Sequence, residues 1–242
     1  HNAEPFFPVA PAWLSKQLSR FVSRRASGII AITQTVKQYL IGSGEILERK
    51  KISVVHYGYP REDDINFRKG SSGKIGTLSR LVPQKDLSTL LRAFEIVLRD
   101  QNHLILEIYG EGPERKKLQD LSNELGIQSS VRLLGRTDQV KKVMREFDIF
   151  VLTSRYEGFG LVLLEAMSNK VPIISSNSDA AMEVLGHEFP LFFQIGDFES
   201  LARLILKVLS TNTADYLEYQ SKRLVQFSPE KMELEIRSIY SR

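Results

Sequence analysis

Residues 148–167 read DIFVLTSRYEGFGLVLLEAM and carry the clearest structural signal in the chain. A short apolar run at 148–152 predicts a buried strand, and the apolar segment at 161–168 predicts a helix. Between them lies a polar loop that contains two glycines. A strand that leads through a short loop into a helix is the first half of a strand–helix–strand unit, so this segment predicts a parallel sheet.

The same alternation of strands and helices continues on both sides. Further strands are predicted at 74–79, 104–109, 131–134, 172–175 and 191–194, each followed by a helical pattern. The helix that opens at Asp86 has apolar residues at spacings of three and four, and Asp86 suits its N-cap. No hairpin signal interrupts the series. The predicted fold class is therefore α/β, a Rossmann-like parallel sheet flanked by helices, whose ligands bind at the carboxyl ends of the strands.

The segments outside this sheet are shorter and less regular. Before it, helices are predicted at 13–25 and 35–40 and strands at 28–33 and 51–56. Residues 57–73 are rich in glycine, serine and aspartate and are interpreted as a linker. Two more helices, at 214–227 and 229–240, finish the chain.

Composition excludes several classes of protein. The 242 residues include 42% hydrophobic and 26% charged residues, as in an ordinary globular domain, and the net charge is only +4. No cysteine is present, which removes disulfide and thiolate chemistry and fits a reducing compartment. No apolar run is long enough to span a membrane, and the first residues lack the layout of a signal peptide. A nucleic-acid partner is not expected, because neither a strong basic excess nor a known module is found.

The helix predicted at 13–25 mixes apolar and basic residues. Its apolar members, at helical spacing, are Trp13, Leu14, Leu18, Phe21 and Val22. One interpretation is a surface helix that packs on its own domain. The other is peripheral attachment to an anionic membrane face.

The loop at 153–160 is a candidate anion site. Gly158 and Gly160 precede a helix, and a glycine-bearing helix N-terminus offers free N–H groups to a diphosphate. The alternative is an ordinary tight turn. Glu165 is the one charged residue in an otherwise apolar helix start, and a buried carboxylate needs hydroxyl or cationic partners. The alternative for Glu165 is exposure on a narrow solvent face. Its side chain should lean toward the loop that holds Glu157.

The loop after the predicted strand 74–79 supplies the opposite charge. Arg80 and Lys85 lie there, outside regular structure, and such side chains bind phosphates. Two solvated surface cations are the alternative. Two acids and two bases on carboxyl-edge loops suit an anionic, hydroxyl-rich ligand such as a nucleotide sugar. No metal site is predicted, because the four histidines are scattered without ligand spacing.

Taken together, these segments resemble the retaining glycosyltransferases of family four, also called glycosyl transferases group 1, which have two facing Rossmann domains (the GT-B fold). The matching pieces are IIAITQTVKQYL, KISVVHYGYP, IGTLSRLVPQKDLSTLLRAF, LEIYGEGPERKKL, VRLLGR and DIFVLTSRYEGFGLVLLEAM, in family order. The last contains the paired glutamates E-x7-E as Glu157 and Glu165. The chain departs from the family pattern at Ser79, where glycine is common, and at Asp179-Ala180, which replaces Gly-Gly.

The resemblance implies a role for each matched residue. Arg80 and Lys85 would bind the donor diphosphate and stabilise the leaving group without a metal or other cofactor. Glu157 would hold the donor sugar, and Glu165 would bind the ribose hydroxyls. The remaining donor-binding residues would be Gly135 and Arg136 beside the base, and Gly158, Phe159, Gly160 and Leu161 against sugar and phosphate. His1 would lie near the transferred sugar on the acceptor side; the alternative is that His1-Asn2 was appended to the chain.

The resemblance also implies an organisation and an activity. Residues 1–56 would be a truncated part of the N-terminal acceptor domain, 57–73 the linker and 74–226 the nucleotide-sugar donor domain, while 227–242 would form a helix that crosses back. The expected function is retaining, metal-independent transfer of a sugar from a UDP-, GDP- or ADP-sugar to a sugar or lipid-linked acceptor, in polysaccharide or glycolipid synthesis. The expected location is the cytoplasm, peripheral to the inner membrane. The alternatives are a nucleotide-sugar epimerase and a nucleotide-sugar-binding module without transferase activity.

Overall fold

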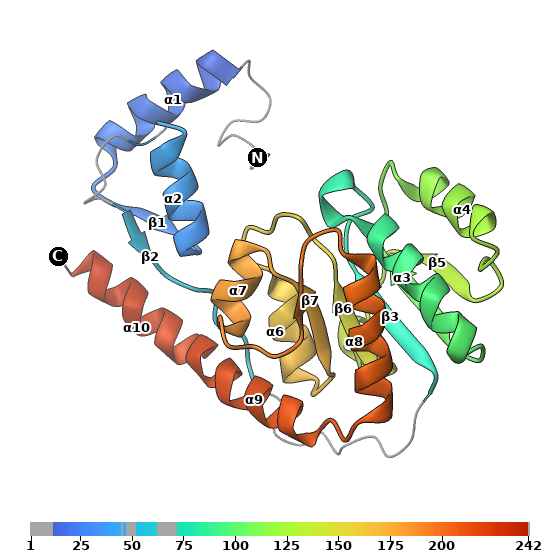
Figure 1. The fold of residues 1–242 in the computed structure, drawn as a ribbon. Helices are drawn as coiled ribbons and strands as arrows, with labels where there is room; N and C mark the ends of the chain where they lie inside the picture. Colours follow the sequence, from blue (N-terminus) through green and yellow to red (C-terminus); the bar gives the residue numbers. More distant parts are fainter. Residues whose placement is uncertain (1–11, 45, 47–51, 62–71, 242) are drawn as a thin grey trace.

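A computed structural model describes residues 12–44, 46, 52–61 and 72–241 (Figure 1). Its strands are β1 (Ile29–Ala31), β2 (Ile52–Val54), β3 (Lys74–Leu78), β4 (Ile105–Tyr109), β5 (Val131–Gly135), β6 (Ile149–Leu152), β7 (Ile173–Ser176) and β8 (Phe192–Phe193). Its α-helices are α1 (Ala12–Arg25), α2 (Gln34–Gly42), α3 (Leu87–Asp100), α4 (Arg115–Glu124), α5 (Val140–Met144), α6 (Leu161–Ser168), α7 (Asp179–Leu185), α8 (Phe198–Ser210), α9 (Ala214–Leu224) and α10 (Pro229–Tyr240). Two 3-10 helices are η2 (Pro83–Lys85) and η3 (Val225–Phe227).

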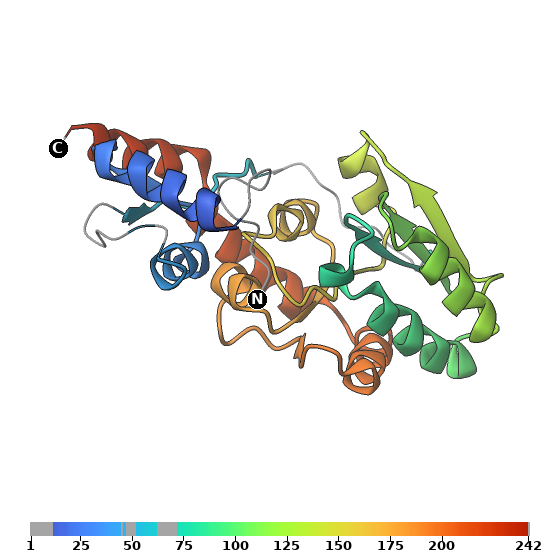
Figure 2. The ribbon, with the colours of Figure 1, turned by 90° about the horizontal axis from the view of Figure 1, so that it is seen from above.

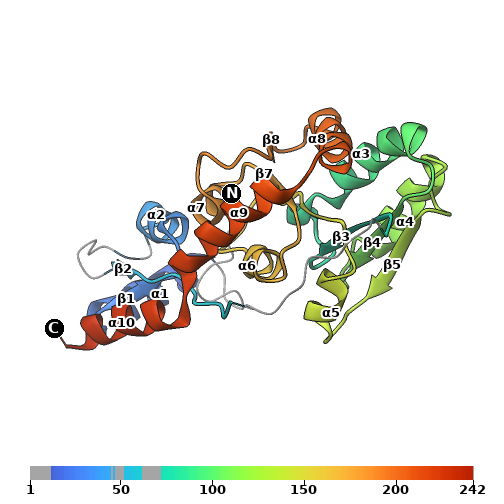
Figure 3. The ribbon, with the colours of Figure 1, turned by 90° about the horizontal axis from the view of Figure 1, so that it is seen from below.

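The larger sheet has six parallel strands in the order β5-β4-β3-β6-β7-β8. Helices α3, α4 and α8 lie on one face and α5 and α6 on the other (Figures 2 and 3). The predicted α/β class and the parallel sheet are therefore confirmed. Strand order reverses direction between β3 and β6, and the carboxyl ends of the strands at such a switch point are where open α/β sheets bind ligands.

The core of this sheet follows the apolar pattern of the sequence. Helix α3 buries Leu87, Leu90, Leu91 and Phe94 and packs against α8. Strand β6 is buried along its whole length. Burial of each such Leu or Phe side chain contributes about 1.5–3 kcal/mol. This packing fixes the sheet, and with it the loops at its carboxyl edge.

Two local predictions were wrong. Lys85 does not lie outside regular structure, because it ends the 3-10 helix η2. Asp86 occupies the N-cap position of α3, but its side chain accepts no capping hydrogen bond, and its backbone is left-handed, with φ of 47°. A further feature is a charged residue within a strand, because Glu107 is buried in the middle of β4. Its carboxylate lies 3.2 Å from the Arg132 guanidinium and 3.5 Å from the Lys74 ammonium.

The N-terminal segments form a second, smaller unit. Strands β1 and β2 pair in parallel, and α2 contacts both. Helix α10 runs back from the six-stranded part to the side of β1 and β2 (Figures 1 and 3). Where α10 begins, Gly58 lies so close to Pro229 that an added Cβ would be 2.5 Å from the Pro229 Cα. The crossing of the chain is therefore tightly packed.

Candidate functional site

A cavity of about 280 Å³ opens at the carboxyl edge of the large sheet, beside the switch point. Four chain segments meet there: the loops after β3, β4 and β5, and the first turns of α6. Its walls contain Arg80, Arg136 and Glu165, three residues that the sequence analysis assigned to donor binding. These side chains come from parts of the chain that are far apart in sequence, and the parallel topology brings them together.

Three charged groups of this cavity lack partners among the described residues, whereas the fourth, Glu111, pairs with Arg115 at 3.8 Å. Arg80 and Arg136 are both exposed, and neither makes an ion pair or side-chain hydrogen bond within the described part of the chain. Glu165 likewise has no side-chain partner among the described residues, and burial raises the pKa of its carboxyl above the ordinary value. A half-buried carboxylate without partners is costly unless a ligand supplies hydroxyls or a cation.

The Ser79 hydroxyl is a further unpaired group. Its Oγ is buried without a hydrogen-bond partner among the described residues, and Ser79 lines the cavity. The loops around it are tied together by backbone hydrogen bonds, from Ser79 N to Tyr109 O at 3.0 Å and from Gly110 N to Gly135 O at 2.7 Å. Gly110 is required for this approach, because a Cβ there would lie 1.8 Å from the Ser79 carbonyl oxygen. Backbone hydrogen bonds therefore hold the loops of the cavity wall together, while the Ser79 hydroxyl in that wall has no hydrogen-bond partner among the described residues.

Lys85 and Glu157 form an ion pair next to this cavity. The ammonium contacts Glu157 Oε1, and the same oxygen accepts a hydrogen bond of 2.6 Å from Ser154 Oγ. Only 12% of the lysine side chain and 9% of the glutamate side chain are exposed. The pair joins the loop after β3 to the loop after β6, on the two sides of the switch point.

The loop between Glu157 and α6 has a defined geometry. Gly160 is the N-cap of α6 with φ of 85°, a left-handed conformation that favours glycine. Phe159 is buried, and its ring packs at 5.3 Å from Tyr57 and 5.9 Å from Phe227. The Gly158 carbonyl accepts a hydrogen bond of 2.9 Å from Thr33 Oγ1, in the N-terminal unit. The two units therefore touch at the candidate site.

The predicted residues fall into two neighbouring groups. One lines the cavity, and the other is the Lys85–Glu157 pair with Gly158 and Gly160 beyond it. Gly135 ends β5 with φ of 74°, and Leu161 is exposed at the start of α6. His1 lies outside the described residues. The sequence analysis missed further residues that line the cavity: Leu78, Tyr109, Glu111, Thr137, Val140 and Val162.

Tyr109 links the cavity to the buried acid Glu107. Its hydroxyl is 3.4 Å from Glu107 Oε2. Burial, with the negative charge of Glu107 as the next cause, raises the pKa of Tyr109 above its ordinary value. Tyr109 is therefore a neutral cavity residue. Only its position at the end of a predicted strand could have signalled this role.

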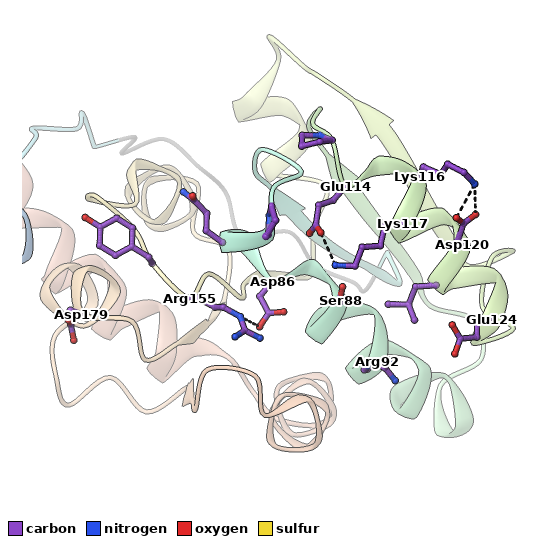
Figure 4. A pocket seen from close by; sticks show the side chains of 15 residues that line it. Asp86, Ser88, Arg92, Glu114, Lys116, Lys117, Asp120, Glu124, Arg155 and Asp179 are labelled. Carbon is purple, nitrogen blue, oxygen red and sulfur yellow. Dashed lines mark hydrogen bonds and ion pairs between the residues drawn. The ribbon is translucent and has the colours of Figure 1, made fainter. Parts of the chain in front are cut away.

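A larger groove, of about 1260 Å³, lies between α3 and α4 (Figure 4). Its labelled acidic and basic side chains occur largely in pairs, with Asp86 facing Arg155 and Glu114 facing Lys117. Although it is bigger than the cavity, it is a poorer ligand site because its charges already neutralise one another.

Among the described residues, no cluster of three histidine, aspartate or glutamate side chains is arranged to hold a metal ion.

Glu183, on α7, connects the N-terminal unit to the unit that contains the six-stranded sheet. Its carboxylate accepts hydrogen bonds from the backbone N–H groups of Gln34 and Thr35, at 2.8 and 3.3 Å, at the start of α2. His56 Nε2 lies 2.7 Å from the same group. Burial alone would raise the pKa of Glu183, but these hydrogen bonds outweigh it and lower the pKa. The ionised carboxylate is thus the form that stabilises the contact.

We expect Glu183→Gln to lower the melting temperature at pH 7 by about 2–8 °C, because hydrogen bonds to a charged group are weakened. A lowered folded-state pKa contributes stability above the unfolded value, and this contribution is lost as pH falls through the folded value. The variant and the wild type should therefore converge in acid. Thermal unfolding across pH measures this, with the exposed Glu188→Gln as control. Equal melting temperatures at pH 7 would contradict the role of Glu183.

The fold and the cavity define an α/β protein with a polar ligand site at the switch point of a parallel sheet. The family model of the glycosyl transferases group 1 matches residues 60–224, which is more than half of the chain. The chain therefore belongs to this family.

Two curated relatives illustrate the similarity. The poly(ribitol-phosphate) α-N-acetylglucosaminyltransferase of Staphylococcus aureus is 35% identical over 101 residues, which is 42% of this chain and 20% of that protein. The GDP-mannose-dependent α-(1-6)-phosphatidylinositol monomannoside mannosyltransferase of Mycobacterium tuberculosis is 33% identical over 130 residues, which is 50% of this chain and 34% of that protein. The chain thus spans about a third or less of the length of these relatives.

Solved structures share the fold. The crystal structure of Anabaena HepE in complex with UDP-glucose superposes with a TM-score of 0.78 at 20% sequence identity, covering 98% of this chain and 70% of that one. The match includes both the small unit and the six-stranded sheet. The expected GT-B-type architecture is therefore confirmed.

Proposed function

We propose that this chain carries the donor-binding part of a glycosyltransferase that takes a sugar from a nucleoside-diphosphate sugar. The observation that carries the proposal is the set of unpartnered polar groups in the cavity. Arg80 and Arg136 are free cations, Glu165 is a half-buried carboxylate, and the Ser79 hydroxyl is buried and unpaired within the described part of the chain. A diphosphate satisfies the cations and the hydroxyl, while ribose hydroxyls satisfy the carboxylate.

The relatives support this ligand class. The mycobacterial relative is named for GDP-mannose, and HepE was solved with UDP-glucose. Both ligands are sugars linked to a nucleoside diphosphate. The curated relatives are named for a poly(ribitol-phosphate) and for a phosphatidylinositol monomannoside, so the acceptor class proposed here is a polysaccharide or lipid-linked sugar.

The proposed reaction is transfer with retention of anomeric configuration and without a metal. The bond between the sugar C1 and the diphosphate breaks while the acceptor oxygen bonds to C1 from the same face. The acceptor proton passes to the leaving phosphate oxygen. Lys85 and Arg80 stabilise the negative charge that develops on that phosphate, which is electrostatic catalysis. Glu157 holds the sugar hydroxyls and thereby orients C1.

We expect the chain to bind one of UDP, GDP and ADP more tightly than the other two, with the same affinity in excess EDTA as with added Mg²⁺. The three cationic side chains Arg80, Lys85 and Arg136 supply the charge that a metal would otherwise supply. Isothermal titration of the chain measures this. If none of the three diphosphates binds, or if binding requires the metal, the proposal in this form is wrong.

We further propose that α1 contacts an anionic membrane surface. The helix packs inward with Ser19 and Ser23, which are buried, whereas its larger apolar residues point outward. These exposed residues are Leu14, Leu18 and Phe21, with Phe21 exposed by 57%, whereas Val22 lines a small cavity with Ser19 and Ser23. The helix has four basic residues and no acidic one. An outward apolar stripe beside unopposed cations suits the surface of an anionic bilayer. Among the described residues, no helix has the length and apolar character needed to cross a membrane.

Vesicle co-sedimentation measures this contact. The chain should bind vesicles that contain phosphatidylglycerol and bind pure phosphatidylcholine weakly, because the attraction is partly electrostatic. The double variant Leu18→Ser, Phe21→Ser should lose binding. Leu234→Ser, which changes an apolar residue of α10 that is 68% exposed, is the matched control and should retain it. Equal binding by both variants would show that the stripe of α1 serves another contact.

A further inference from the structure

Asp86 occupies a position that its residue type does not explain by local preference. Aspartate is favoured at helix N-caps because its carboxylate accepts a hydrogen bond from the first turn. Here that hydrogen bond is absent, and the backbone has φ of 47°. A left-handed backbone costs free energy for a residue with a Cβ, and glycine would adopt it without that cost. The carboxylate of Asp86 therefore has a different use.

That use is a contact with the loop after β6. Asp86 Oδ2 accepts a hydrogen bond of 3.0 Å from Arg155 Nε, and Figure 4 shows the two side chains facing one another at the edge of the groove. The aspartate side chain is only 9% exposed, whereas 60% of the arginine side chain is exposed. The pair lines the groove and does not line the cavity.

Two hydrogen bonds to backbone carbonyls reinforce the same contact. Arg155 N donates to the Gln84 carbonyl at 2.8 Å, and Thr153 Oγ1 donates to the Lys85 carbonyl at 2.7 Å. These bonds and the ion pair hold the residues on both sides of Lys85. In the loop after β6 they hold residues 153–155, which end two residues before Glu157.

We propose that Asp86 and Arg155 are positioning residues that clamp the Lys85 loop to the Glu157 loop. This inference rests on the proposed function, because it concerns the placement of the residues assigned to phosphate and sugar. The clamp acts through Lys85: it fixes the backbone on both sides of that residue, so the ammonium stays beside the donor phosphates. Neither Asp86 nor Arg155 has to touch the donor.

A double-mutant cycle in binding affinity tests the clamp. The probe is whichever of UDP, GDP and ADP the wild-type chain binds most tightly. Arg155→Ala should weaken its binding by about three- to tenfold, as expected for loss of a partly buried ion pair that positions a ligand group. Asp86→Gly keeps the left-handed backbone, removes the carboxylate, and should weaken binding equally. In a Lys85→Ala background, Arg155→Ala should change the affinity no further.

The matched control is Arg92→Ala. Arg92 is an exposed cation on α3 that lines the same groove and touches neither loop, so its loss tests the effect of net charge alone. It should leave affinity unchanged. Additive losses from Arg155→Ala and Lys85→Ala would mean that Arg155 acts independently of Lys85 and would overturn the clamp.

Amide hydrogen exchange separates failure of the clamp from failure of the proposed function, because it needs no ligand. Lys85 N and Asp86 N donate to Val82 O and Pro83 O within the 3-10 turn. Exchange at the amides of Lys85 and Asp86 should become faster in Arg155→Ala and not in Arg92→Ala. Unchanged exchange overturns the clamp whether or not a diphosphate binds. Faster exchange without any diphosphate binding supports the clamp and rejects the proposed function.

Discussion

Replacing Lys85 by alanine should weaken binding of the preferred nucleoside diphosphate by about a hundredfold, the effect expected for loss of a strong charge-assisted contact. The lysine ammonium is nearly buried and lies in the loop that follows β3 at the switch point. Its removal also leaves Glu157 without its cationic partner, and an unpaired buried carboxylate repels an incoming phosphate. The single variant therefore combines two unfavourable changes.

Titration calorimetry on single and double variants separates the two causes. Lys85→Ala with Glu157→Gln removes the stranded charge as well, and should recover roughly tenfold of the lost affinity. Lys117→Ala is the matched control, because that lysine pairs with Glu114 at the start of the same helix, α4, and does not line the cavity. If Lys85→Ala binds as tightly as the wild type, Lys85 has no part in phosphate binding.

Glu165→Gln should have opposite effects on stability and on binding. Burial without a partner raises the pKa of Glu165, so ionisation at neutral pH destabilises the unliganded protein. The isosteric amide removes this charge, and the melting temperature should rise by about 2–4 °C at pH 7. The same change removes the charged acceptor for ribose hydroxyls, and affinity should fall by about tenfold.

The pH dependence provides a second check on Glu165. A group whose folded pKa is raised leaves the protein unaffected below its ordinary value, and its penalty grows as pH rises through the folded value. The melting temperatures of the wild type and Glu165→Gln should thus agree in acid and separate toward neutral pH. Glu111→Gln alters an exposed carboxylate on the same wall and should not change stability. A variant that is less stable and binds normally would show that Glu165 is structural.

Short-range patterns predicted most of the fold. The spacing of apolar residues in α3 and the continuous apolar run of β6 are properties of neighbouring residues, and both elements lie where they were expected. The meeting of Arg80 and Glu165 at one cavity was also expected, because parallel strands present their carboxyl ends at one edge, whereas Arg136 was assigned only through the family resemblance. For these features the physical cause, the spacing of apolar residues and the order of strands and helices, can be read from the sequence itself.

Pairings across the chain could not be predicted in this way. Glu107 is a charged residue in the buried strand β4. Its burial is explained only by its ion pairs with Lys74 and Arg132, which the sequence does not reveal. Asp86 has the right identity for an N-cap, and only the position of Arg155 reveals its other contact. The orientation of α1 was equally hidden, because its spacing of apolar residues does not say which face meets the small sheet.

The mutual contact of Lys85 and Glu157 has a consequence for competition by other solutes. In the unliganded protein, each group serves as the counterion of the other. Inorganic phosphate could engage the lysine only by leaving the glutamate uncompensated, and it offers no sugar hydroxyls in return. A nucleotide sugar can satisfy both groups at once. On the proposed function, such a site favours the complete nucleotide sugar over ligands that carry phosphate alone, because only the sugar donor replaces both interactions.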